Sequence, residues 1–187
     1  MSTPENTTSG SDTGIEKLDL IDCYKQMAAT GRQIRGLSML QHRYSIKTLI
    51  ERSGSKKVLD YGSGAGDAYR SPYKLHKIFG LGRADITLYD PAFPDFDKLP
   101  DGNFDLVICS DVLEHIPEHQ IDELLSRLFS YADKAVWASV CCRPAHKKLP
   151  GTHINTHVTI KPFSWWQERF NAKNTKKGVE AVLVETL

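Results

Sequence analysis

The feature that most constrains the fold is a short apolar run that ends in three closely spaced glycines. Residues 57–61 read Lys-Val-Leu-Asp-Tyr, and residues 62–66 read Gly-Ser-Gly-Ala-Gly. An apolar run bounded by turn residues predicts a buried β-strand. Glycines directly after it let the backbone turn sharply and approach a ligand without interference from a Cβ atom. The chain therefore predicts an α/β domain with a ligand-binding loop after its first strand.

Strand and helix patterns alternate along the rest of the chain. The predicted strands are 57–61, 84–89, 104–110, 135–140 and 179–185, and the predicted helices are 15–29, 37–52, the segment that follows Pro117, and 163–170. Alternation of this kind predicts a three-layer, doubly wound, mostly parallel sheet with helices on both faces. We expect the last strand to be antiparallel. Residues 1–14 carry no large apolar side chain after Met1 and predict a flexible tail, which leaves 15–187 as a single domain.

Charge and composition exclude several classes of protein. The formal net charge is +1, so no bulk field attracts the chain to nucleic acid or to an anionic membrane. No apolar run approaches the roughly 20 residues that a transmembrane helix needs, and the N-terminus has no signal-peptide pattern. The four cysteines, Cys23, Cys109, Cys141 and Cys142, form no C-x-x-C pair. We therefore expect reduced thiols in a cytoplasmic protein.

Two carboxylates near the glycine loop indicate which kind of ligand it binds. Asp60 lies at the end of the first strand, two positions before Gly62, where it would disfavour the pyrophosphate of a dinucleotide and favour a cationic group. Asp90 ends the second strand, where nucleoside-binding sheets hold ribose hydroxyls. The pattern predicts a nucleoside that carries positive charge.

Four stretches in this order resemble the class I S-adenosylmethionine-dependent methyltransferases: Val58–Gly66, Leu88–Asp90, Leu99–Val107 and Asp111–Pro117. The resemblance implies a Rossmann-like fold, an enzyme, and S-adenosylmethionine as cofactor. It places the 62–66 loop under the methionine part and Asp90 on the ribose. The cofactor-binding residues that it implies are Asp60, Gly62, Ser63, Gly64, Gly66, Asp90, Pro91, Asp95, Phe96, Ser110 and Asp111.

The chain departs from the family between the second and third strands. By resemblance, Asp95 meets the adenine amino group and Phe96 lies beside the ring, while Ser110 and Asp111 form a wall near the methionine part. Only four residues separate Asp90 from Asp95, where the family normally inserts a helix and a strand. Either that unit is deleted and the sheet is smaller, or Asp95 is not the adenine contact.

The candidate catalytic residues are Glu114, His115, His153 and His157. Histidine suits general base chemistry near neutral pH, and the loops at the carboxyl ends of parallel strands commonly carry such groups. The alternative is that Glu114 and His115 only begin the next helix.

The segment around residues 149–158 resembles a loop of small bacterial and phage methyltransferases that have an Asn-x-His element before a Trp-Trp helix. Here the element is Asn155-x-His157. Trp165 and Trp166 then form either a lid over the pocket or, for at least one of them, part of the core.

The sequence favours a site without a metal. The alternative is a divalent ion on Asp111, Glu114, His115 and His157 (or His153), because this set resembles that of metal-dependent 2′-O-methyltransferases of small-RNA ends. Carboxylate and imidazole ligands together suit Mg, Mn, Fe or Zn.

We therefore expect methyl transfer from S-adenosylmethionine to an O or N nucleophile on a small molecule or an exposed end. One alternative is a metal-assisted 2′-O-methyltransferase that acts on a nucleic-acid end. The other is a non-catalytic sensor or partner subunit that binds S-adenosylmethionine. Asp60 and the G-x-G-x-G spacing disfavour a nicotinamide-dependent oxidoreductase.

Overall fold

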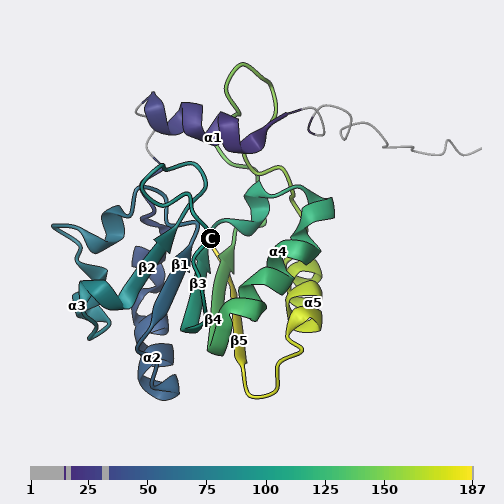
Figure 1. Cartoon of the computed structure of the whole chain (residues 1–187). Coiled ribbons are helices and arrows are strands. Elements are labelled where there is room, and N and C mark those ends of the chain that lie inside the picture. The colour runs from purple at the N-terminus through teal and green to yellow at the C-terminus, as the bar shows by residue number, and fades with distance from the viewer. Residues whose placement is uncertain (1–14, 16–17, 31–33, 187) are drawn as a thin grey trace, which may run out of the picture.

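A computed structural model describes residue 15 and residues 18–30 and 34–186, and it contains one five-stranded sheet (Figure 1). The tail predicted for residues 1–14 lies outside the described residues. The strands are β1 (Val58–Tyr61), β2 (Ile86–Tyr89), β3 (Phe104–Ser110), β4 (Ala132–Val140) and β5 (Glu180–Glu185). They lie in the order β2-β1-β3-β4-β5. The order reverses between β1 and β3, which is where open α/β sheets bind their ligands.

All four strand pairings are parallel, so the predicted antiparallel last strand is wrong. Helix α5 (Phe163–Lys173) returns the chain from the carboxyl end of β4 to its amino end. The turn that follows is held there, because Lys176 Nζ donates to the carbonyls of Ser130 and Ala132 at 2.8 and 3.0 Å. A strand that starts at this end can only run parallel to β4.

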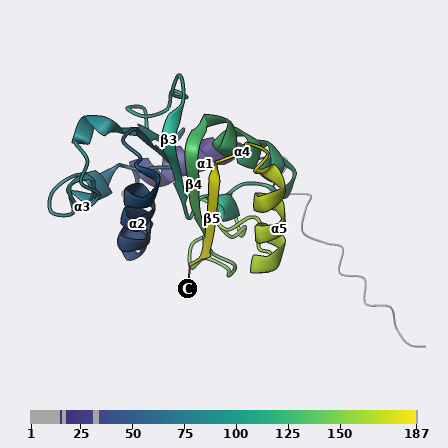
Figure 2. The ribbon, with the colours of Figure 1, turned by 90° about the horizontal axis from the view of Figure 1, so that it is seen from below.

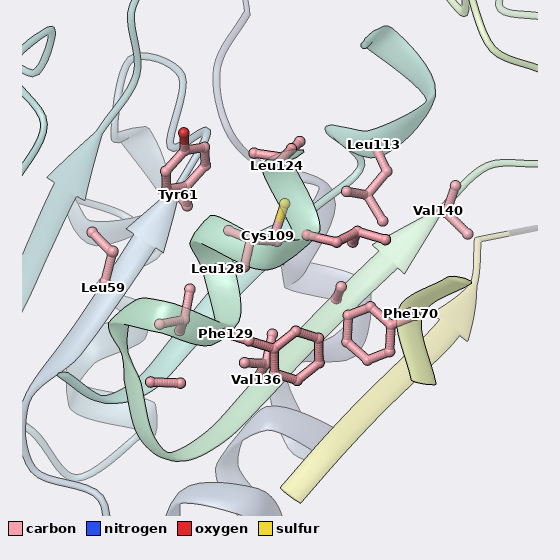
Figure 3. Packing of buried hydrophobic residues seen from close by; sticks show 14 of the residues in the cluster. Leu59, Tyr61, Cys109, Leu113, Leu124, Leu128, Phe129, Val136, Val140 and Phe170 are labelled. Carbon is pink, nitrogen blue, oxygen red and sulfur yellow. The ribbon is translucent and has the colours of Figure 1, made fainter. Parts of the chain in front are cut away.

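Helices cover both faces of the sheet, as the alternating pattern predicts (Figure 2). On one face lie α4 (Glu118–Tyr131) and α5, whose Leu124, Leu128, Phe129 and Phe170 pack on the strands (Figure 3). On the other face lie the short 3₁₀ helix η2 (Ser38–His42), α2 (Arg43–Ser53) and α3 (Leu75–Ile78). The doubly wound, Rossmann-like prediction is confirmed.

Three predicted helices have other bounds in the structure, and the one predicted over 163–170 extends to Lys173. Helix α1 (Leu20–Ala29) begins later than residue 15, because the Asp19 side chain caps it by accepting the Asp22 N–H at 3.0 Å. The helix predicted over 37–52 is divided into η2 and α2. Three further 3₁₀ turns, η3 (Asp67–Tyr69), η4 (Arg83–Asp85) and η5 (Leu113–His115), lie in connections.

The connection from β2 to β3 contains neither helix nor strand. It folds back at once, because the Asp90 N–H donates to the Phe96 carbonyl at 3.0 Å. The unit that the family inserts here is therefore deleted, and the sheet is correspondingly small.

Helix α1 and the loop of residues 141–162, called the 141–162 loop below, lie over the carboxyl edge of the sheet (Figure 1). The ends of β1, β2 and β3, where the predicted site residues lie, are directly below them. None of the helices that the structure describes is both long enough and apolar enough to span a bilayer.

Candidate active site

The three glycines of the 62–66 loop all have positive φ angles, between +56° and +85°. A Cβ atom on Gly62 would lie 2.3 Å from Val112 Cγ2, and one on Gly64 would lie 2.7 Å from the Ile34 carbonyl oxygen. Glycine is thus required both for the backbone conformation and for the close approach of other parts of the chain. The atoms nearest to the loop belong to the protein itself, so its glycines do not by themselves identify a ligand.

Asp90 ties the glycine loop to the end of β2. Its two carboxylate oxygens accept the N–H groups of Gly64 at 2.8 Å and Ala92 at 2.9 Å. Burial raises the pKa of Asp90 from its ordinary value, and these two hydrogen bonds oppose the rise. Each carboxylate oxygen has a second lone pair, so both can still accept a ribose hydroxyl.

Among the described residues Asp60 forms no salt bridge and no hydrogen bond, although the nearby Tyr69 hydroxyl and the Arg83 charge oppose the rise of its pKa. The side chain is 1% exposed, and among the described residues no donor lies within hydrogen-bond distance of either oxygen. The neighbouring Tyr69 hydroxyl donates instead to Met39 Sδ at 3.5 Å. Burial, with a smaller contribution from Asp90, raises the pKa of Asp60 to about 7. A buried carboxylate without partners is costly, and a cationic group beside it would offset the cost.

Of the two adjacent residues predicted at the adenine, Phe96 lies against the glycine loop and Asp95 faces solvent. Phe96 reaches the glycine loop, since a Cβ atom on Gly66 would lie 3.5 Å from its ring. Asp95 is exposed, and Pro91 is half-buried. The roles of all three toward a cofactor stay predictions.

Ser110 and Asp111 follow the end of β3 and are held by the neighbouring strands. Ser110 Oγ lies 3.1 Å from Ser139 Oγ, and the Asp111 carboxylate accepts the hydroxyls of Ser139 and Thr186, both at 2.6 Å. Asp111 has φ +53°, which is uncommon for a residue other than glycine. The structure thus fixes this carboxylate at the carboxyl edge, at a cost in backbone strain.

Glu114 lies three residues further on, in η5, and is fully buried. One carboxylate oxygen accepts the Cys141 N–H at 3.0 Å, and the other, Oε2, has no hydrogen-bond partner among the described residues. Burial, together with the nearby Asp111, raises the pKa of Glu114 to about 8. Glu114 therefore lies in η5, ahead of α4, and its role in a site stays a prediction.

His115 and His157 face each other edge to face, with ring centres 4.8 Å apart. His115 Nδ1 lies 2.8 Å from the Thr156 carbonyl oxygen, and His157 Nδ1 lies 2.6 Å from the Arg143 carbonyl oxygen. A carbonyl only accepts, so both Nδ1 atoms carry the proton and both Nε2 atoms carry a lone pair. Burial, helped by His157, lowers the pKa of His115 to about 4.

Asn155 holds the 141–162 loop in shape. Its side-chain oxygen accepts the N–H groups of Ala145 and His157, and its amide nitrogen donates to the Ala145 carbonyl at 2.8 Å. The Asn-x-His element therefore positions His157. His153 is exposed, and the structure does not bring it to the other candidate residues.

Neither tryptophan forms a lid, because α5 packs on the face of the sheet rather than over its edge. Trp166 is fully buried in the core, as predicted for at least one of the two. Trp165 is half-buried, with the Arg169 guanidinium 4.3 Å from its ring centre.

The sequence analysis missed two residues of the site, Tyr24 and Cys141. The Tyr24 hydroxyl of α1 donates to the Thr156 carbonyl at 3.0 Å and lies 2.9 Å from His115 Nδ1. In the sequence this tyrosine is one residue of an apolar helical stripe, with no local signal of a polar role. Cys141 follows β4 directly, and it looks like an ordinary buried thiol until the path of the loop is known.

The comparison with protein families identifies the family of the chain. A family model described as a methyltransferase domain matches residues 39–176, from η2 to the turn before β5. The chain belongs to the class I S-adenosylmethionine-dependent methyltransferases. This methyltransferase matches no curated protein and no solved structure. The family implies S-adenosylmethionine as cofactor, and the unpaired carboxylate of Asp60 beside the glycine loop fits its positive charge.

Proposed function

We propose that this methyltransferase methylates an O or N nucleophile on a small molecule or an exposed end, and that the acceptor binds at His115 and His157. The observation that carries the proposal is the imidazole pair. Both Nδ1–H groups are held by backbone carbonyls, which leaves two Nε2 lone pairs at the carboxyl edge of the sheet.

The cofactor side rests on β1, β2 and the loops after them. Asp60 offsets the positive charge of the bound cofactor, and Asp90 accepts the ribose hydroxyls with its remaining lone pairs. Ser110 and Asp111 form the wall toward the acceptor. Val112, which packs on Gly62, connects the two sides, because Glu114 is only two residues further along the chain.

Bound S-adenosylmethionine supplies an electrophilic methyl carbon on a positively charged sulfur. Transfer of this methyl group to the acceptor would leave S-adenosylhomocysteine and would release one proton from the acceptor. His157 Nε2 takes the proton that the acceptor loses. We assign this role to His157 because His115 is more deeply enclosed and its lowered pKa makes it a weak base. Glu114, Tyr24 and the Thr156 carbonyl position the imidazoles.

A small acceptor or a chain end fits the arrangement better than the middle of a polymer. Helix α1 and the 141–162 loop both lie over the carboxyl edge, and Tyr24 joins them through the Thr156 carbonyl. The net charge of +1 supplies no general attraction for nucleic acid.

The test compares one variant on each side of the site. We expect calorimetry to show binding of S-adenosylmethionine and S-adenosylhomocysteine but not of NAD. Asp90→Ala should abolish this binding, with Asp90→Asn as a milder variant that retains one acceptor oxygen. His157→Ala should retain binding and reduce turnover about 100-fold or more, measured as S-adenosylhomocysteine formed with a panel of hydroxyl and amine acceptors. Equal loss of binding in both variants would show that the acceptor side is placed wrongly.

A further inference from the structure

A third potential ligand lies beside Glu114 and His157. A carboxylate oxygen of Glu114, the Cys141 Sγ and an imidazole nitrogen of His157 all lie within 4.8 Å of one another. They come from η5, from the residue that follows β4, and from the 141–162 loop. Carboxylate, thiol and imidazole together form a set of ligand atoms that proteins use for transition metals.

Glu114 supplies a second, independent observation. Its side chain is 0% exposed, and Oε2 has no hydrogen-bond donor among the described residues, although Oε1 accepts the Cys141 N–H at 3.0 Å. Buried polar atoms are normally paired, and an unpaired one requires a partner such as an ion. The oxygen without a partner belongs to the carboxylate that lies against the thiol and the imidazole.

The surroundings of His157 fit metal binding as well. Its Nδ1–H is donated to the Arg143 carbonyl at 2.6 Å, and this carbonyl also lies 3.7 Å from Cys141 Sγ. Histidines that bind metals almost always donate their other ring N–H to such an acceptor, which fixes the ring and its tautomer. With its Nδ1–H on this carbonyl, His157 has Nε2 free to coordinate an ion.

We propose that Glu114, Cys141 and His157 bind one Zn²⁺ ion, or a similar transition-metal cation, and leave its fourth position open. Three protein ligands with an open position are typical of catalytic zinc sites, whose ligand atoms lie roughly 3.5 Å apart. The ligand atoms need to close by about 1 Å to reach that spacing, which side-chain rotation can supply.

This set differs from the four residues that the sequence suggested. The Asp111 carboxylate already accepts two hydroxyls, from Ser139 and Thr186. His115 lies outside the cluster, with its Nδ1–H on the Thr156 carbonyl. Because Cys141 supplies a soft sulfur ligand, the site selects Zn²⁺, Co²⁺ or Fe²⁺ over Mg²⁺.

The role of the ion rests on the proposed function, but its binding does not. The bound ion would occupy the lone pair of His157, so the imidazole base proposed above applies to the metal-free protein. In the metal-bound protein the ion would itself lower the pKa of an acceptor hydroxyl.

The experiment uses the full chain, stripped of metal by a chelator and then titrated with Co²⁺, Zn²⁺ or Mg²⁺. We expect one equivalent of Co²⁺ to produce a thiolate-to-cobalt charge-transfer band, Zn²⁺ to remove it by competition, and Mg²⁺ to have no effect. Cys141→Ser should abolish the band, and His157→Ala should weaken binding roughly 100-fold. Cys142→Ser is the matched control, because this neighbouring thiol is not in the cluster, and it should retain the band.

Absence of the band, or a band that survives Cys141→Ser, would overturn the metal site. Circular dichroism and S-adenosylhomocysteine binding in the same samples establish that each variant is folded. A protein without the band that still methylates an acceptor refutes the metal and leaves the proposed function standing. A protein with the band that methylates none of the hydroxyl and amine acceptors refutes the acceptor proposal alone.

Discussion

Three buried carboxylates lie at the carboxyl edge of the sheet, and they differ in the number of hydrogen bonds that each accepts. Asp90 accepts two backbone N–H groups, Glu114 accepts one, and Asp60 accepts none from the described residues. Burial is the largest cause of the raised pKa in all three. The site therefore stores unfavourable electrostatic energy that a cationic ligand can release, most of all at Asp60.

Asp60→Asn should flatten the pH dependence of stability. The pKa of Asp60 is about 7 in the folded protein against an ordinary 3.8, so the folded state keeps a proton that the unfolded chain releases. The free energy of unfolding therefore falls as pH rises between these values, by up to about 4 kcal/mol. Asparagine removes this contribution. Urea unfolding at pH 5 and pH 8 measures the part of this fall that lies above pH 5, about 3 kcal/mol.

Glu114→Gln is the variant for comparison with Asp60→Asn. Glu114 also lowers the free energy of unfolding as pH rises, and its contribution extends to about pH 8. If the free energy of unfolding changes between pH 5 and pH 8 by the same amount in Asp60→Asn as in the wild-type protein, Asp60 is ionised in the folded protein without penalty. Asp60→Asn should also weaken S-adenosylmethionine binding by about tenfold or more, because a paired charge is lost.

At the scale of elements, the glycine loop and η5 are packed together. Gly62 at the end of β1 lies against Val112, which directly precedes η5. The glycine loop and η5 therefore share a close contact, and a change at Gly62 or Val112 should affect both.

Gly62→Ala should destabilise the protein more than Gly54→Ala does. Both glycines have positive φ, +85° and +63°, but a Cβ atom on Gly54 meets nothing within 4 Å. Gly54→Ala should cost about 1 kcal/mol from the backbone alone. Gly62→Ala should cost about 1–3 kcal/mol more, because its Cβ would lie 2.3 Å from Val112 Cγ2. Denaturant midpoints measure both.

Val112→Ala in the Gly62→Ala background should recover part of that loss, since it removes the clashing methyl groups. No recovery would mean that backbone strain, and not the contact with Val112, requires glycine at this position.

At the scale of the whole molecule, the sheet has five strands and lacks the unit that the family inserts after β2. In place of that unit the chain has only the loop that folds back from Asp90 to Phe96, which we predict to lie on the adenine side. The family match, which extends from η2 to the turn before β5, shows that the reduced sheet is still a methyltransferase domain.

S-adenosylmethionine and S-adenosylhomocysteine should stabilise the whole domain. A ligand that binds only the folded state at 100 times its Kd adds about 2.7 kcal/mol. For a chain of this length that raises Tm by about 5–10 °C, which a thermal-shift assay detects. NAD should leave Tm unchanged. A shift with NAD, or none with either methyltransferase ligand, would contradict the placement of the cofactor.

The amino-acid sequence by itself determined the features that depend on neighbouring residues. The apolar run of β3, the stripe of α4, and the glycine loop between Asp60 and Asp90 could all be predicted from it. Each is a local pattern whose spacing matches a strand, a helix or a turn. The same patterns were sufficient to predict the fold class and the family.

Only the tertiary structure decided the direction of β5 and the composition of the acceptor side. Tyr24 and His115 are 91 positions apart, and Cys141 is 27 positions from Glu114. Such contacts depend on strand register and on the path of a loop, which local residue patterns do not specify. For the same reason, Cys141 and His157 meet at Glu114, while His153, in the same loop, stays in solvent.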